Sequence, residues 1–175
     1  MENRLIILNG PSSSGKSTLA RILRDLILKK RGDLYEIVSI DDFLNMSAHE
    51  PIYEDDVFEI SPALIEAASR ALETGGVIIE HVITSRRIYD QLTDAFRGCG
   101  RRLIRVTCPG EILAAREAAR KDRCPGSAAA SDEYLFPKDG YDLMVDTQEM
   151  SAAECEERIF ESAFHEAPSE REQKP

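Results

Sequence analysis

The stretch "ILNGPSSSGKST", residues 7–18, largely decides the fold of this chain. Residues 10–17 match the pattern G-x-x-x-x-G-K-[ST] at every fixed position, with an apolar run before them and a helical pattern after them. The two glycines let the backbone curl so that successive N–H groups point inward, and the following helix adds partial positive charge at the same place. The stretch therefore predicts a phosphate-binding loop between a strand and a helix.

The side chains of this loop indicate what it binds. Lys16 supplies a full positive charge for the outer phosphates, the Ser17 hydroxyl is a hard oxygen ligand for Mg²⁺, and Thr18 is placed to touch an inner phosphate. The alternative is a serine-rich turn that matches the motif by chance. The strand and helix patterns on either side of the motif favour the phosphate-binding loop, because a chance match needs neither. We therefore expect ATP and Mg²⁺ to be held by Gly10, Pro11, Ser12, Ser13, Ser14, Gly15, Lys16, Ser17 and Thr18.

Strand and helix patterns alternate five times along the chain. The strand patterns span residues 4–10, 35–40, 77–83, 102–108 and 141–147. The helical patterns span residues 17–30, 61–76, 85–100, 110–123 and 151–164. Ser61 and Pro62 are expected to cap and open the second of these helices. The alternation predicts an α/β fold of the P-loop NTPase type, with a five-stranded parallel sheet and helices on both faces.

A single domain is expected over residues 1–165, followed by a flexible polar tail over residues 166–175. Two segments, residues 43–60 and 124–140, fit neither pattern. Long irregular segments in an α/β protein are typical of binding loops and lids. We therefore expect an acceptor-side segment at about residues 43–75 and a lid at about residues 120–138.

Composition and charge disfavour several classes of protein. No apolar run approaches the ~20 residues that span a bilayer. The apolar run at residues 5–8 is too short for a signal peptide, so we expect a cytoplasmic protein without a membrane partner. A net charge of −10 disfavours binding to nucleic acid, and four cysteines without a C-x-x-C pair favour free thiols over a zinc site. The sequence does not predict an oligomeric state.

Three carboxylates follow the second and third predicted strands. Asp41 and Asp42 leave the second strand at the carboxyl edge of the sheet, where open α/β sheets bind their ligands. One is expected to accept the proton of an attacking hydroxyl and the other to hold a magnesium-bound water, although a helix cap or solvated turn is the alternative. Glu80 either holds a second metal-bound water or pairs with a nearby base. His81 beside it is more typical of a packed side chain than of a catalyst.

Three arginines, Arg116, Arg120 and Arg123, lie where the fourth predicted helix runs into the irregular segment. Arg116 and Arg120 are four residues apart and are expected to share a helix face, with Arg123 about one turn further on. They either satisfy the dipole of a helix C-terminus or form a lid that reaches the triphosphate. The glycine, proline and alanines that follow favour the lid, in which Arg120 and Arg123 would stabilise charge during transfer.

Several stretches together resemble the chloramphenicol phosphotransferase-like proteins, which are small P-loop kinases grouped with shikimate and adenylate kinases. The stretches are "IILNGPSSSGKS", the aspartate after the second strand, "REAARKDRCPG" and "YDLMVDT", and the resemblance extends to about residue 163. It implies transfer of a phosphoryl group from ATP to a hydroxyl, with Asp41 as the general base and Arg120 and Arg123 in the lid. It also implies that Asp146 and Thr147 lie beside the adenine pocket.

The acceptor-side segment is acidic, which limits the acceptor. Residues 32–69 contain ten carboxylates and no lysine or arginine. Nucleoside monophosphate kinases must clamp an acceptor phosphate, usually with arginine, and only Arg86 and Arg87 remain as candidates for a clamp. We therefore expect a neutral or cationic small molecule with a hydroxyl group. Because this segment and the Glu80–His81 pair depart from the antibiotic kinase, the resemblance leaves open whether chloramphenicol is an acceptor.

Three functions from different classes remain open from the sequence. The first, which the sequence favours, is an ATP-dependent O-phosphotransferase that acts on a small-molecule alcohol. The second is a kinase acting on a nucleoside, a nucleotide or an activated sugar. The third is a nucleotide-binding protein with little catalysis.

Overall fold

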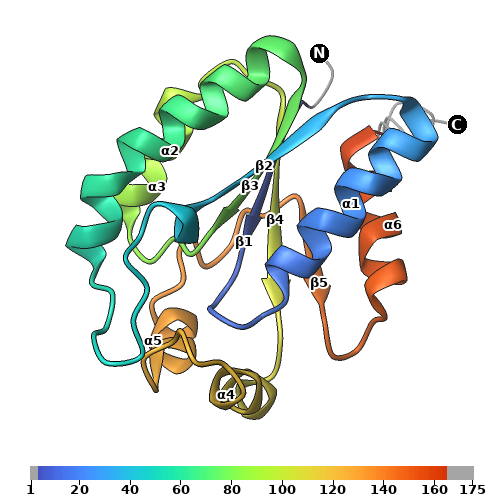
Figure 1. The fold of residues 1–175 in the computed structure, drawn as a ribbon. Helices are drawn as coiled ribbons and strands as arrows, with labels where there is room; N and C mark the ends of the chain where they lie inside the picture. Colours follow the sequence, from blue (N-terminus) through green and yellow to red (C-terminus); the bar gives the residue numbers. More distant parts are fainter. Residues whose placement is uncertain (1–3, 165–175) are drawn as a thin grey trace, which may run out of the picture.

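A computed structural model describes residues 4–164 of the chain, so the tail expected at residues 166–175 lies outside the described residues. Five parallel strands form one sheet in the order β2-β3-β1-β4-β5 (Figure 1). The strands are β1 Leu5–Asn9, β2 Tyr35–Ser39, β3 Gly76–His81, β4 Arg101–Thr107 and β5 Leu143–Asp146. The helices are α1 Lys16–Arg31, η1 Ile40–Asp42 (a single 3₁₀ turn), α2 Glu54–Thr74, α3 Arg86–Ala95, α4 Gly110–Ala118, α5 Ser127–Glu133 and α6 Ala152–Phe164. The predicted α/β class and five-stranded parallel sheet are confirmed.

Helices cover both faces of the sheet, as the alternation predicts. In Figure 1, α2 and α3 lie on one face, α1 and α6 lie on the other, and α4 and α5 lie beyond the carboxyl ends of the strands. Within the described residues, no helix combines the length and apolar character needed to cross a membrane.

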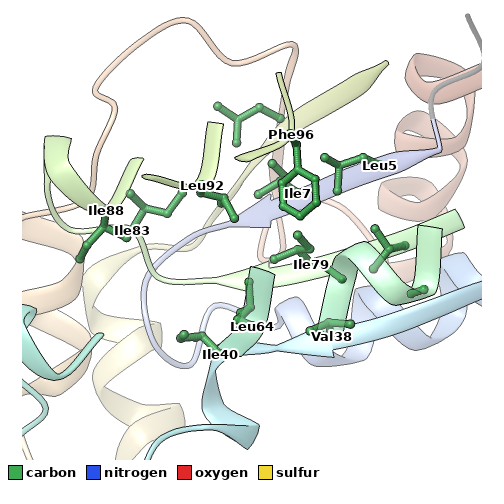
Figure 2. Close-up of a cluster of buried hydrophobic side chains, with 14 of the residues drawn as sticks. Leu5, Ile7, Val38, Ile40, Leu64, Ile79, Ile83, Ile88, Leu92 and Phe96 are labelled. Atoms are coloured by element: carbon green, nitrogen blue, oxygen red, sulfur yellow. The ribbon is translucent and has the colours of Figure 1, made fainter. Parts of the chain in front are cut away.

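The central strand β1 separates two hydrophobic clusters. Because side chains alternate along a strand, Leu5 and Ile7 pack into the cluster beneath α2 and α3, which Figure 2 shows, whereas Ile6 and Leu8 pack into the cluster beneath α1 and α6. All four side chains are buried. A strand that is apolar on both faces is typical of the centre of a parallel sheet, and it fixes the position from which the phosphate-binding loop departs.

The prediction that Ser61 and Pro62 begin a helix is wrong. Helix α2 begins two turns earlier, at Glu54, and contains both residues. The Asp56 carboxylate accepts a hydrogen bond from the N–H of Tyr53 at 2.8 Å, and three acidic residues in the first turn suit the positive end of the helix dipole. Ser61 is buried inside the helix, where its hydroxyl donates to the carbonyl of Val57 at 2.7 Å. The irregular part of the acceptor-side segment is therefore shorter than expected.

The fourth predicted helix is also divided. Helix α4 ends at Ala118, because the N–H of Arg120 bonds to the carbonyl of Glu117 in a turn. Arg116 and Arg120 therefore do not share a helix face, and Arg120 and Arg123 lie in the loop that follows. The segment 124–140, expected to be irregular, contains the short helix α5.

Asn9, at the end of β1, ties the loops around the carboxyl edge together. Its amide nitrogen donates to the carbonyl of Phe136 at 2.9 Å and to the hydroxyl of Tyr141 at 2.8 Å. Its amide oxygen accepts from the N–H of Ile83 at 2.9 Å. Asn9 is fully buried, so each of these bonds replaces water that the side chain has lost. One side chain therefore fixes the loop after β3 and the chain that returns from α5.

The substitution Asn9→Asp should lower the free energy of unfolding by about 2–4 kcal/mol, because a carboxylate cannot donate to the Phe136 carbonyl and would be buried beside it. Tyr141→Phe removes a single hydroxyl from the same network and should cost only about 1 kcal/mol. Urea unfolding of both variants measures the difference. Equal costs would show that the amide of Asn9 does not organise these loops.

Candidate active site

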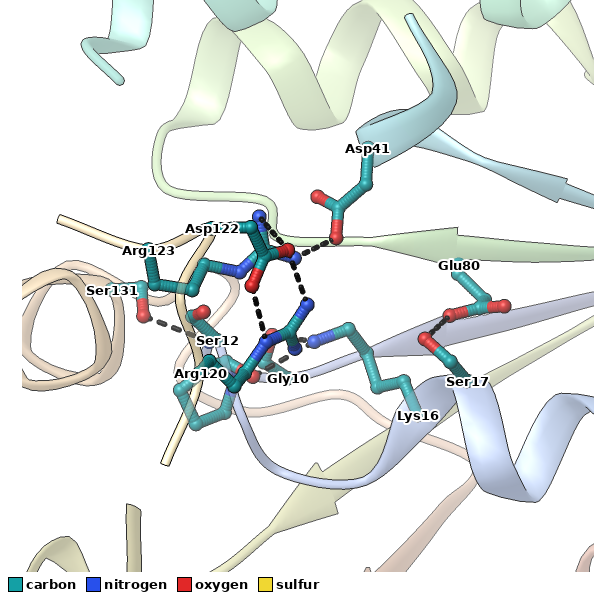
Figure 3. Close-up of polar contacts among 11 residues, drawn as sticks. Gly10, Ser12, Lys16, Ser17, Asp41, Glu80, Arg120, Asp122, Arg123 and Ser131 are labelled. Atoms are coloured by element: carbon teal, nitrogen blue, oxygen red, sulfur yellow. Dashed lines mark hydrogen bonds and ion pairs between the residues drawn. The ribbon is translucent and has the colours of Figure 1, made fainter. Parts of the chain in front are cut away.

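A cavity of about 1070 Å³ lies at the carboxyl edge of the sheet. The phosphate-binding loop forms one wall, residues from 44 to 57 form another, and the α4–α5 region forms a third. The predicted site residues that line it are Ser12, Ser13, Gly15, Lys16, Ser17, Thr18, Asp41, Glu80, Arg116, Arg120 and Arg123. The structure thus brings together residues separated by more than one hundred positions in the sequence (Figure 3).

The backbone of the phosphate-binding loop explains its glycines. A Cβ atom at Gly10 would lie 2.3 Å from the carbonyl oxygen of Val106 in β4, so no other residue fits there without a shift of the backbone. Gly15 caps α1 with a φ of +97°, and Ser13 also has a positive φ, of 66°. Left-handed residues of this kind turn successive N–H groups toward the concave side of a loop.

Lys16 is buried at the bottom of this loop. Its ammonium group donates to the carbonyls of Gly10 at 2.9 Å and Pro11 at 2.8 Å. Burial lowers the pKa of Lys16 to about 8, although the charges of Asp41 and Glu80 oppose this shift. The ammonium group is thus held beside the loop by neutral carbonyls. A negatively charged phosphate oxygen would bind it more strongly and replace them.

Two of the predicted metal-binding oxygens adjoin one another. The Ser17 hydroxyl donates to a carboxylate oxygen of Glu80 at 2.6 Å. Burial raises the pKa of Glu80, and the hydrogen bond from Ser17 and the charge of Lys16 oppose that shift. Asp42 is exposed and lies outside the lining of the cavity. The described residues contain no cluster of three or more acidic, histidine or cysteine side chains that would hold a metal by itself.

Each lid arginine is paired with a carboxylate. Arg123 is ion-paired with Asp41, the candidate base on η1. Arg120 makes two hydrogen bonds to Asp122, at 3.0 and 2.9 Å, which hold the pKa of Asp122 down at about 2. In Figure 3, Arg120 lies beside Gly10 and Lys16, whereas Arg123 points toward Asp41. The predicted lid segment thus contacts η1 through the pair of Arg123 and Asp41.

Several buried hydrogen-bonding atoms lack a partner among the described residues. They include Nε and Nη1 of Arg123 and the hydroxyls of Ser13 and Ser14. Only 4% of the Arg123 side chain is exposed, so these nitrogens cannot be satisfied by bulk water. Buried donors without partners are rare in folded proteins. Around a phosphate-binding loop, they match the oxygens of a bound polyphosphate.

Asp146 and Thr147, at the end of β5, do not line the cavity, and Thr147 contacts Arg116. The hydroxyl of Thr147 donates to the carbonyl of Ser14 at 2.8 Å and accepts from Arg116 at 2.9 Å. Asp146 accepts hydrogen bonds from the N–H groups of Gln148 and Glu149, at 2.8 and 3.1 Å. Thr147 therefore holds Arg116 against the phosphate-binding loop, and Asp146 stabilises the turn after β5. Their position beside an adenine pocket stays a prediction.

His81 is fully buried and outside the lining of the cavity. Burial lowers its pKa to about 4, so the imidazole is neutral at pH 7. Three further residues with polar roles around the site, Asn9, Glu117 and Ser131, were not predicted from the sequence. The partners through which they connect separate segments lie from 9 to 132 positions away, and no local spacing indicates them.

Comparisons with known proteins agree with this geometry. The model of the family described as "Chloramphenicol phosphotransferase-like protein" matches residues 3–164. Proteins named "Putative O-phosphotransferase" in two strains of Mycobacterium tuberculosis are each 28% identical over 185 residues, which cover 92% of this chain and 82% of theirs.

Solved structures of kinases share the fold. The APS kinase of Mycobacterium tuberculosis, in complex with AMPPNP and APS, has a TM-score of 0.72 at 16% identity and covers 92% of this chain and 97% of its own. A gluconokinase from Sinorhizobium meliloti has a TM-score of 0.64 at 21% identity and covers 90% of both chains. A sugar kinase from Janibacter has a TM-score of 0.67 at 21% identity, with 90% of this chain and 92% of its own covered.

The lowered pKa of Lys16 predicts how nucleotide binding responds to pH. Bound phosphates favour the protonated amine, so the complex holds a proton that the free protein loses above about pH 8. The affinity for Mg²⁺-ADP should therefore fall as the pH rises from ~8 to ~9.5, with a slope that approaches about tenfold per pH unit. Lys16→Arg stays charged throughout and should give a flatter profile in isothermal titration calorimetry. Parallel profiles for the two proteins would contradict the assignment.

Proposed function

The chain belongs to the chloramphenicol phosphotransferase-like protein family, and from this premise we propose that it transfers the γ-phosphoryl group of ATP to a hydroxyl group of a small molecule. One observation carries the proposal. The donors of the phosphate-binding loop, a buried lysine and a carboxylate paired with a lid arginine all line the same cavity. Such a cavity holds the groups needed to bind a polyphosphate and to receive the proton of an attacking alcohol.

In the proposed reaction, Asp41 accepts the proton of the acceptor hydroxyl. The acceptor oxygen forms a bond to the γ-phosphorus while the bond from that phosphorus to the β,γ-bridging oxygen breaks, which releases ADP. Lys16 and the lid residues Arg120 and Arg123 offset the negative charge on the transferring group. For this to happen, Arg123 exchanges its ion pair with Asp41 for the phosphate oxygens, and the carboxylate becomes free to act as base.

The adjoining oxygens of Ser17 and Glu80 fit Mg²⁺, which binds hard oxygen ligands and usually keeps several waters. In this proposal Ser17 ligates the ion directly, and Glu80 holds one of its waters. When bound, the ion would neutralise charge on the β- and γ-phosphates. Asp42 was predicted to hold a second such water, but its exposed position outside the cavity lining gives that role no support.

The acceptor wall of the cavity is mainly apolar. It is formed by Leu44, Met46, Pro51, Ile52, Val57 and Val82. Tyr53, from the segment before α2, and Tyr134, from the end of α5, also line the cavity, and both are largely exposed, at 66% and 61%. Tyrosines that flank an apolar wall combine large contact area with a polar tip. We propose that the acceptor has an apolar or aromatic body that carries the hydroxyl group.

A phosphorylated acceptor is disfavoured because the candidate arginine clamp is used elsewhere. Arg87 pairs with Glu54 at 2.5 Å and with Asp55, and it stacks on the ring of Phe58 with its guanidinium carbon 4.5 Å from the ring centroid. Arg86 is highly exposed and pairs with Asp90. Neither arginine lines the cavity. The acceptor half therefore offers acids and apolar surface, which suit a neutral or cationic alcohol.

A screen of acceptors tests the proposed function. ADP formation from Mg²⁺-ATP should be stimulated by neutral or cationic alcohols with an apolar body. Nucleosides, nucleoside monophosphates and phosphorylated sugars should give much less stimulation. A preference for a nucleotide or a sugar phosphate would place the protein in the second functional class. Tight ATP binding without stimulation by any acceptor would favour a binding protein.

Asp41→Asn should have opposite effects on transfer and on nucleotide affinity. Transfer to a working acceptor should fall about 100-fold or more, because asparagine cannot take the proton. Binding of Mg²⁺-AMPPNP should become a few-fold tighter, because Arg123 no longer has to leave a carboxylate. Steady-state kinetics and calorimetry measure the two effects.

Three variants control this experiment. In an Arg123→Ala background, Asp41→Asn should no longer tighten AMPPNP binding. Glu59→Gln, an exposed residue of α2 outside the cavity lining, makes the same change of charge and should alter neither quantity. Loss of transfer in Asp42→Asn, with near-normal transfer in Asp41→Asn, would assign the base to Asp42.

A further inference from the structure

We infer that Glu117, the penultimate residue of α4, is a positioning residue that sets the lid arginines against the phosphates. The inference rests on the proposed function, because the arginines matter only where a polyphosphate binds. Glu117 does not line the cavity, so any effect on the nucleotide must pass through other residues. We call residues 118–125 the arginine loop, since they contain Arg120 and Arg123.

Glu117 closes the arginine loop from both ends. Its carboxylate is buried and accepts hydrogen bonds from the N–H of Gly126 at 2.8 Å and the N–H of Ala128 at 2.7 Å. Its main-chain carbonyl accepts from the N–H of Arg120 at 2.9 Å. Both ends of the arginine loop are therefore hydrogen-bonded to Glu117, which limits the positions that its two arginines can adopt.

The same carboxylate also positions α5. Gly126 caps this helix with a φ of +89°, and Ala128 lies in its first turn, so Glu117 satisfies N–H groups at the start of the helix. One turn further along α5, the hydroxyl of Ser131 accepts a hydrogen bond from the N–H of Ser12 in the phosphate-binding loop, at 2.9 Å. Glu117 is thus connected to the phosphate site by two routes, through the arginine loop, whose Arg120 N–H it binds, and through α5 with Ser131.

A carboxylate is required at this position because two N–H donors need two acceptor oxygens. In Glu117→Gln, one oxygen becomes an NH₂ group that faces another donor, so one of the two bonds is lost and a repulsive contact replaces it. Glu117→Asp keeps the charge but is one methylene shorter, so it cannot reach both N–H groups. Both variants should loosen the arginine loop, and the second keeps the test available if the first fails to fold.

Trypsin measures the order of the loop directly, because Arg120, Lys121 and Arg123 are cleavage sites within it. Under native conditions, cleavage in the arginine loop should be about tenfold faster in Glu117→Gln than in the unaltered protein. Cleavage after Arg70 in α2 serves as the internal reference and should not change. Glu111→Gln, an exposed residue of the same helix, is the matched control and should leave both rates unchanged.

Nucleotide binding tests whether loop order serves the phosphates. The affinity for Mg²⁺-AMPPNP should fall about tenfold in Glu117→Gln, whereas the affinity for Mg²⁺-ADP should change less than about twofold. In an Arg123→Ala background the same substitution should add little further loss, because the group that it positions is gone. Such non-additivity is not expected of a residue that only stabilises the fold.

Three results would overturn the inference. They are unchanged cleavage in the arginine loop, equal losses for both nucleotides, and losses that multiply in the Arg123→Ala background. Failure of the proposed function gives a different pattern. In the acceptor screen the unaltered protein would then prefer a nucleotide or a sugar phosphate, or respond to no acceptor, while the trypsin experiment would still report whether Glu117 orders the loop.

Discussion

Hydrogen-bond donors are concentrated at the phosphate-binding loop, and several of the buried ones lack an acceptor among the described residues. The other groups of the candidate site lie around these donors. Lys16 donates hydrogen bonds to two carbonyls of its own loop, and the N–H of Ser12 donates to the hydroxyl of Ser131. Two nitrogens of Arg123 have no hydrogen-bond partner among the described residues, although Nη1 is ion-paired with Asp122 at 3.9 Å. Buried donors without hydrogen bonds are unfavourable, and the oxygens of a bound polyphosphate would satisfy those that gather around this loop.

Local patterns were enough to predict the sheet and most of the cavity. The buried strand before the loop, the loop itself and Asp41 after β2 depend on neighbouring residues, and the parallel sheet brings their ends to one edge. The errors arose where distant contacts prevail over local preference. The Ser61–Pro62 pair has the composition of a helix start, yet acidic residues two turns earlier provide a better one. Helix α4 ends in a turn at Glu117, whose carboxylate bonds to residues at the start of the next helix.

The acceptor-side segment is acidic in sequence, but in the structure two of its acids are ion-paired and many of its cavity-lining residues are apolar. In the sequence, ten carboxylates without a lysine or arginine indicate a neutral or cationic acceptor. The structure shows that Arg87 from α3 pairs with Glu54 and Asp55, and that most of the cavity-lining residues between 44 and 57 are apolar. Under the proposed function, selectivity against phosphorylated compounds would come from the absence of an available arginine on the described acceptor wall, and affinity would come from apolar contact.

The contacts of Arg87 also determine how the acceptor wall can move. Arg87 joins the first turn of α3 to the first turn of α2 through two carboxylates and the ring of Phe58. These contacts oppose a change in the relative position of the two helix starts. The irregular residues 43–53 contact the core through Phe43, Leu44 and Ile52 but contain no helix or strand. Closure of the acceptor side around a bound molecule would accordingly be a rearrangement of this connector, with the helix pair serving as its stationary support.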